Sequence, residues 1–219
     1  MCDSPESSRE HAPPLCFFPE AIGIGRDLRR NLKTVPSCNR HNSRKSKDDE
    51  YFRSVILMTA AQASAAGKHQ FFEKLLPAAA RTPHAHRSVF GDKGTIAAGR
   101  GRVLQVDRKR FDACVDHLAR ALFFDAYQQK WSLPIVVISP NFFNGIASDQ
   151  VVPHQPTLGA VQVSRQVLAA EPVRGENHEV FRYRLRFDEA DGSYALAAIF
   201  YDCFEVYSFS SAQLAEAAL

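Results

Sequence analysis

The chain has 219 residues, of which 45% are hydrophobic and 23% are charged, a balance typical of folded globular proteins and not of disordered ones. No apolar run approaches the ~18 residues of a membrane-spanning helix, so we expect a protein without membrane contact. The five cysteines are odd in number and widely spread, which argues against a disulfide framework and favours a reducing cytoplasm.

The first third of the chain is predicted to be extended and then helical. Two prolines after His11 impose an extended path, residues 32–36 can form a short strand, and Ser37 is a plausible helix N-cap. Residues 38–66 have the apolar periodicity of a helix, with Gly67 as its stop. The predicted apolar stripe of this helix contains Tyr51, Val55, Met58 and Gln62.

A second helix and a linker are predicted next. Residues 68–81 have helical periodicity, and the Gly- and Pro-containing residues 82–101 suggest a loop. The predicted buried face of the second helix consists of Phe71, Phe72, Leu75 and Leu76.

The rest of the chain is predicted to combine one helix with strands. Residues 107–130 repeat apolar side chains at helical spacing, whereas residues 180–187 alternate apolar and arginine side chains as a half-buried strand does. Residues 135–138 and 194–209 also favour strands, and residues 140–160 suggest a loop. We therefore expect an α+β fold with a C-terminal antiparallel sheet.

Positive charge is concentrated in one stretch, although the formal net charge is only +3. From Arg26 to Lys47 there are eight basic residues and one acidic residue. Clustered basic side chains attract phosphate backbones, so the stretch predicts DNA binding; a solvated basic face is the alternative. The residues predicted to contact nucleic acid are Arg40, Arg44, Lys45 and Lys47.

The motif Cys38-x-x-His41 lies inside this basic stretch. Zinc prefers cysteine and histidine ligands in sets of four. Upstream, only Cys2 is placed to act as a third ligand, so either the chain begins after the fourth ligand or a structural Zn2+ site is incomplete. Cys16 is a possible substitute, but its apolar neighbours favour a buried structural thiol.

Residues suited to metal-assisted hydrolysis flank that motif. Glu10 and His11 precede it, and Asn42 follows directly. Phosphodiester hydrolysis needs a base to activate water and oxygen ligands to hold a hard cation. His11 suits the base because its ordinary pKa lies near neutral pH, while the other two offer oxygens to Mg2+ or Mn2+. The acidic run at residues 47–50 is interpreted as a solvated helix surface.

Together these residues resemble the HNH (His-Me finger, ββα-metal) endonucleases, and most closely a bacterial subgroup with a Cys-x-x-His second zinc knuckle. The resemblance covers residues 2 to about 53 and rests on residues 9–14, 34–42 and 46–52. It implies a treble-clef-like finger in which His11 is the general base, Asn42 binds the catalytic metal, and Glu10 stands where the family often has Asp. The zinc positions that it assigns are Cys2, Cys38 and His41.

We therefore expect a ββα-metal finger with an extended helix over residues 1–66, a helix and linker over 67–106, and an α+β domain of unknown role over 107–219. The expected activity is metal-dependent hydrolysis of DNA. One alternative is a catalytically degenerate, zinc-finger-like module that binds nucleic acid or protein. Another places an enzyme site in the second domain.

Overall fold

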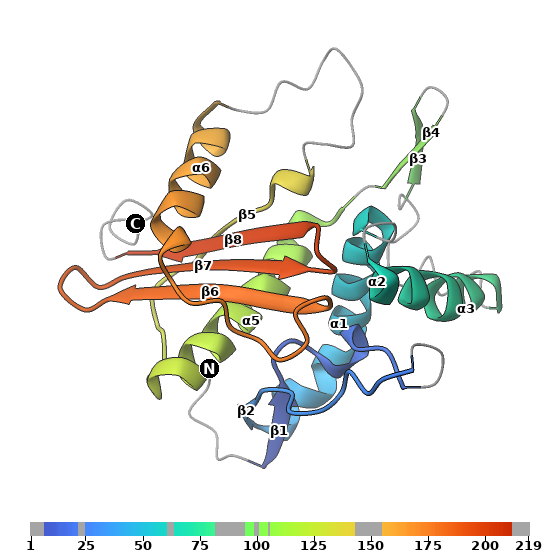
Figure 1. The fold of residues 1–219 in the computed structure, drawn as a ribbon, viewed down its shortest axis with the longest axis horizontal. Coiled ribbons are helices and arrows are strands. Elements are labelled where there is room, and N and C mark those ends of the chain that lie inside the picture. The colour runs from blue at the N-terminus through green and yellow to red at the C-terminus, as the bar shows by residue number, and fades with distance from the viewer. Residues whose placement is uncertain are drawn as a thin grey trace. The chain divides into compact units, whose positions relative to one another are not determined.

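A computed structural model describes residues 7–21, 25–60, 64–81, 95–98, 101–104, 106–142 and 155–211. Helices and antiparallel strands are mixed in it, which confirms the predicted α+β class (Figure 1). The chain divides into two compact units, one containing residues 4–114 and the other residues 115–219. Within the described residues, no helix combines the length and apolarity that crossing a bilayer requires.

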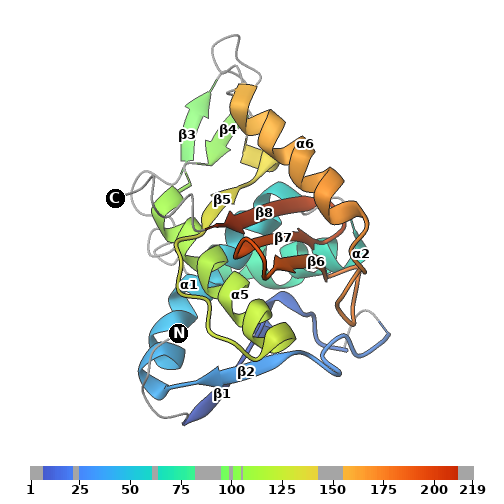
Figure 2. The ribbon, with the colours of Figure 1, turned by 90° about the vertical axis from the view of Figure 1, so that its left-hand side faces the viewer.

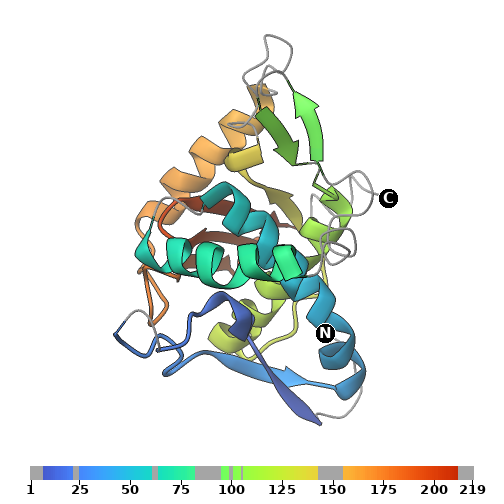
Figure 3. The ribbon, with the colours of Figure 1, turned by 90° about the vertical axis from the view of Figure 1, so that its right-hand side faces the viewer.

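The first unit begins with a β-hairpin that leads into a long helix (Figures 2 and 3). Strand β1 pairs antiparallel with β2, so that Ser8 lies opposite Ser37 and His11 opposite Thr34. A single residue, Cys38, separates β2 from the helix α1. The elements of this unit are β1 (Ser8–His11), the 3-10 turn η1 (Leu15–Phe17), β2 (Thr34–Ser37), α1 (Asn39–Ala60), α2 (Ala65–His69), the π-helical η2 (Gln70–Leu75), α3 (Leu76–Arg81), β3 (Thr95–Ala98), β4 (Gly101–Leu104) and the first part of α5 (Arg108–Tyr127).

Aromatic side chains form the core of the first unit. The Phe52 ring on α1 meets Phe17 at 5.3 Å and Phe111 at 5.2 Å between centroids, both edge-to-face. Tyr51 and Val55 are buried beside it, as the helical periodicity predicted. This core holds α1 through its apolar side, and Lys45, on a polar side of the same helix, faces the hairpin.

Several helix predictions for the first unit are wrong. Ser37 is the last residue of β2 and not an N-cap, and Gly67 lies inside α2, where its N–H bonds the Ser64 hydroxyl at 3.0 Å. Met58, predicted to be buried, is 39% exposed. Residues 95–98, expected to be linker, form β3.

The predicted buried face of the second helix is also wrong. Phe72 is 52% exposed and Leu76 is 44% exposed, whereas Ala66, Gly67 and Gln70 are buried. The π-helical segment η2 interrupts the α-helical period that the prediction assumed, because its hydrogen bonds run from i to i+5.

The second unit is a four-stranded antiparallel sheet in the order β5-β8-β7-β6. Helix α6 lies across one face of this sheet, and the C-terminal half of α5 lies against the other (Figures 1 and 2). The elements of this unit after α5 are β5 (Val136–Ile138), the 3-10 turn η3 (Pro140–Phe142), α6 (Gln155–Ala169), β6 (Phe181–Asp188), β7 (Ser193–Phe200) and β8 (Phe204–Ser210).

Strand β6 has the predicted alternation. Phe181, Tyr183 and Leu185 are buried on the α5 side, and the intervening arginines lie on the α6 side. Arg184 donates to the carbonyl of Ala169 at 2.7 Å, so its guanidinium satisfies the C-terminal end of α6. A strand arginine is therefore used here to hold a helix and not to line an open sheet face.

Two predictions for the second unit are wrong. Residues 155–160, the end of the expected loop, are the first part of α6, because Val161 and Leu168 further along this helix pack against the sheet. The expected strand over 194–209 is two strands, interrupted by Tyr201 and Asp202 with φ of 49° and 64°. That turn lets β8 fold back on β7.

Candidate hairpin–helix site

The Glu10 carboxylate lies on the side of the hairpin that faces α1. It accepts a hydrogen bond from the Ser37 hydroxyl at 3.2 Å, across the hairpin. Its other oxygen lies 3.4 Å from Nζ of Lys45, which extends from the second turn of α1. The side chains of this ion pair are only 17% and 13% exposed, so Glu10 is held in a polar pocket between strand and helix.

Asp49 adds a second carboxylate to the same side of α1, one helical turn after Lys45. Burial raises its pKa from 3.8 to about 6, with Lys45 opposing the shift and the charge of Glu10 adding to it. Two carboxylates and one ammonium therefore share a partly desolvated region. The sequence analysis treated Asp49 as part of a solvated surface and did not predict its partial burial near Lys45. The spacing of four residues between them, which places both on one side of a helix, was the available signal.

His11 ends β1 and alternates with Glu10, so the two side chains leave opposite faces of the hairpin. Arg9 shares the His11 face, where it donates to the Thr34 hydroxyl at 3.0 Å. Burial lowers the pKa of His11 below 6.5, which keeps the imidazole neutral at neutral pH. A neutral imidazole is the form that can accept a proton from water.

Asn42 lies in the first turn of α1, three residues before Lys45. The side chains of residues 39–44 lie outside the described part of the chain, as does Cys2. The predicted ligands Cys2, His41 and Asn42 and the predicted DNA contacts Arg40 and Arg44 therefore stay predictions. Cys38 is buried at the junction of β2 and α1.

The acidic run after Lys45 is not a uniformly solvated surface. Lys47 and Glu50 are exposed, but Asp48 accepts a hydrogen bond from Nε of Arg110 on α5 at 2.6 Å. The Arg110 guanidinium also lies 4.3 Å from the centre of the Tyr51 ring. These contacts hold the second and third turns of α1, and with them the position of Lys45.

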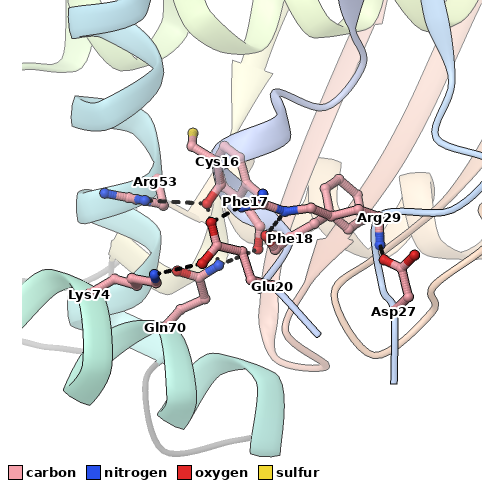
Figure 4. A network of polar contacts seen from close by, with 9 residues as sticks. All are labelled: Cys16, Phe17, Phe18, Glu20, Asp27, Arg29, Arg53, Gln70 and Lys74. Atoms are coloured by element: carbon pink, nitrogen blue, oxygen red, sulfur yellow. Dashed lines mark hydrogen bonds and ion pairs between the residues drawn. The ribbon is translucent and has the colours of Figure 1, made fainter. Parts of the chain in front are cut away.

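The segment that follows His11 is anchored by side chains from three other segments (Figure 4). The carbonyl of Cys16 accepts from Arg53 at 3.3 Å and from Gln70 at 3.4 Å. The carbonyl of Phe18 accepts from Arg29 at 3.0 Å, and Glu20 pairs with Lys74, also at 3.0 Å. Hydrogen bonds from charged donors, here Arg29 and Arg53, are stronger than neutral ones. They hold the backbone of the segment that follows β1 in place.

Cys16 behaves as a structural thiol. Burial raises its pKa to about 11, and its Sγ lies 3.8 Å from the carbonyl oxygen of Asp49. Its neighbours Phe17 and Phe18 are buried, as is usual around a structural cysteine. The structure therefore supports the buried-thiol interpretation over the substitute-ligand one.

The donors near Glu10 match a hard cation in kind. Carboxylate oxygens such as those of Glu10 and Asp49 are the ligands that Mg2+ and Mn2+ prefer. Among the residues the structure describes, however, no group of three or more His, Cys, Asp or Glu is arranged to hold a metal ion. Lys45 supplies the positive charge beside Glu10 in this structure.

The second unit contains a groove of about 380 Å3 between α6 and the strands. Val163, Val167 and Phe209 contribute apolar walls, and Arg186 contributes a charge. Its lining includes no His, Cys, Asp, Glu or Lys among the described residues, so it offers neither a general base nor a carboxylate pair. The first unit is therefore the better candidate for chemistry.

No family model matches the chain, and no curated protein or solved structure shows significant similarity to it.

Proposed function

We propose that the protein is a metal-dependent HNH-type endonuclease that hydrolyses DNA phosphodiester bonds in a reducing cytoplasm. The observation that supports this most is the order of elements: an antiparallel hairpin leads within one residue into α1, and Glu10 of the hairpin faces that helix. In the proposal, β1, β2 and α1 form the ββα-metal finger, and a structural Zn2+ on Cys2, Cys38 and His41 braces it.

The proposed chemistry assigns one task to each group. His11 takes the proton of the attacking water, since its lowered pKa leaves the imidazole neutral. Glu10 and Asn42 would hold Mg2+ or Mn2+, and the metal would supply polarisation of the scissile phosphate. Exposed Lys47, together with Arg40 and Arg44, would attract the DNA backbone, whereas Lys45 is engaged by Glu10.

The test is cleavage of supercoiled plasmid by the His11→Ala variant with Mg2+ or Mn2+. Loss of a general base should lower the rate by about 10²–10⁴-fold. His178→Ala, in an exposed loop of the second unit, is the matched control and should cut like the wild type. Circular dichroism of both variants excludes unfolding as the cause. Unchanged cutting by His11→Ala would remove His11 as the base.

The second candidate is a catalytically degenerate finger that binds nucleic acid or protein. Two observations favour it. The Lys45 ammonium occupies an oxygen that the nuclease proposal assigns to the metal, and strand alternation places His11 on the opposite face of the hairpin from Glu10. This candidate predicts salt-sensitive DNA binding without cleavage under Mg2+, Mn2+ or Zn2+. Cleavage by the wild type that is lost in His11→Ala would exclude it.

A further inference from the structure

Helix α6 presents more apolar side chains than its attachment to the sheet uses. Val161 and Leu168 are 4% and 1% exposed, and they anchor the helix on the sheet. Val163 and Val167 lie one turn apart on the helix, are 58% and 39% exposed, and line the groove of about 380 Å3 between α6 and the strands. Single exposed apolar side chains are common on any surface, but apolar side chains that line a groove of this size are typical of a site for a small molecule.

The register of the sheet explains why the groove is there. Arg186 on β6 lies opposite Ala195 on β7, and Ala195 lies opposite Phe209 on β8, so the three form one row on the face that α6 covers (Figure 1). Ala195 has only a methyl group, so the middle of the row is lower than its two ends. Ala160, which lines the groove from the helix, is equally short. The hollow therefore comes from small side chains facing each other under α6.

Arg186 is the charged side chain of this groove among its described lining residues. Its side chain is 46% exposed, and the Asp188 carboxylate lies 3.7 Å from the guanidinium, too far for a hydrogen bond. Asp191 is also near enough for the charge of Arg186 to act on it, but neither aspartate lines the groove. The other two arginines of β6 are engaged, Arg182 by an aspartate and Arg184 by the carbonyls that end α6. Of the three, only Arg186 has its guanidinium donors available to a molecule in the groove.

We infer that this groove binds a small molecule that has an apolar body and one terminal carboxylate. The apolar body would lie between Val163, Val167 and Phe209, where its burial removes apolar surface from water. The carboxylate would accept from Arg186, because the planar fork of a guanidinium matches two carboxylate oxygens. The inference goes beyond the proposed function, since the groove lies in the second unit and this binding needs neither a metal ion nor DNA.

The experiment is isothermal titration calorimetry of the full chain with sodium octanoate, below its micelle concentration. Two further ligands separate the contributions: 1-octanol keeps the apolar chain without the charge, and acetate keeps the charge without the chain. Octanoate should bind with one molecule per chain and at least about tenfold more tightly than 1-octanol, since a hydrogen-bonded ion pair is added to the same apolar contact. Acetate should bind more weakly still, because it lacks six buried methylene groups.

Variants of both ends of the groove test the assignment of residues. Arg186→Gln should bind octanoate about tenfold more weakly and 1-octanol as the wild type does. Arg182→Gln is the matched control, because Arg182 lies on the same strand and outside the groove, and it should bind octanoate normally. Val163→Glu should weaken binding of both ligands, whereas Val173→Glu, at an exposed valine outside the groove, should not. Circular dichroism checks that each variant is folded.

Three results would each overturn the inference. The first is an absence of octanoate binding by the wild type. The second is equal affinity for octanoate and 1-octanol, which would show that no charge of the protein recognises the carboxylate. The third is wild-type affinity for octanoate in both Arg186→Gln and Val163→Glu, which would place the ligand elsewhere. None of these results bears on the proposed nuclease, whose residues lie in the first unit.

Discussion

The two compact units place their charges differently. The first unit holds Glu10, Lys45 and Asp49 in partly buried positions around the start of α1. The second unit buries an aromatic cluster and uses its arginines at the margins of the sheet, as when Arg184 binds the end of α6. Burying a charge costs stability unless the charge is paired, and the Lys45–Glu10 pair offsets that cost in the first unit.

The arginines of the second unit bind helix ends and loops, and one of them, Arg120, is itself partly buried, with its side chain 16% exposed. Arg120 forms a two-point ion pair with Asp116 at 2.7 and 2.9 Å, and it also donates to the Leu133 carbonyl at 3.1 Å. Arg165 pairs with Glu205 at 2.7 Å. Each of these charges has a partner that fixes a loop or a helix. These arginines of the second unit therefore serve its fold, and the proposed chemistry is placed in the first unit.

Phe123→Ala should have the largest effect on stability, because the core of the second unit is apolar. The Phe123 ring is 1% exposed and lies 5.0–5.6 Å from the rings of Trp131, Phe187 and Tyr194. We expect a loss of about 3–5 kcal/mol in the free energy of unfolding. Urea denaturation measures this loss. Phe124→Ala is the control, and it should lose less stability because Phe124 is partly exposed. A loss below about 1 kcal/mol would contradict the assignment of this core.

Lys45→Met should have the next largest effect, in the metal-free protein. Removing the ammonium leaves Glu10 and Asp49 partly buried without their counter-ion, at a cost of about 2–3 kcal/mol. Lys47→Met should change stability by less than about 0.5 kcal/mol, because Lys47 is exposed. Thermal unfolding of both variants measures the difference. Equal melting temperatures would show that the first unit does not depend on this internal charge.

Asp49→Asn should stabilise the metal-free protein at pH 7, by about 1–2 kcal/mol. The folded-state pKa of Asp49, about 6, exceeds the ordinary 3.8, so the folded state binds the proton more tightly than the unfolded chain. The contribution of Asp49 to stability therefore falls as pH rises from about 4 to about 6 and is constant above that. Urea denaturation from pH 4 to pH 7 should show the advantage of the variant shrinking as pH falls. A pH-independent difference would contradict the raised pKa.

Arg184→Gln should have the smallest of these effects. It removes charged hydrogen bonds to the last carbonyls of α6, which we expect to cost about 1 kcal/mol. Arg186→Gln is the control on the same strand. The Arg186 guanidinium lies 3.7 Å from the Asp188 carboxylate, and because both side chains are exposed this contact should contribute little to stability. Circular dichroism during urea denaturation measures both. Equal losses for the two variants would show that the α6 contact has no special role.

Much of the secondary structure followed from periodicity. The helix α5 and the alternating strand β6 were predicted because their apolar spacings of 3.6 and 2 report burial directly. Helix α6 was missed because its Pro- and Gly-containing sequence resembles a loop and its apolar contacts are with the sheet. The π-helical η2 was missed because its hydrogen bonding changes the period itself.

The sequence by itself determined the α+β class and the helix that begins near residue 38, and it named candidates for a base and for metal ligands, which stay predictions. Only the tertiary structure decided that Lys45 neutralises Glu10, that Asp49 is partly buried beside them, and that Asp48 binds Arg110. The physical reason is that spacing reports which face of an element is apolar, whereas the partner of a charge comes from another segment. Glu10 and Lys45 are 35 positions apart, and only folding brings them to 3.4 Å.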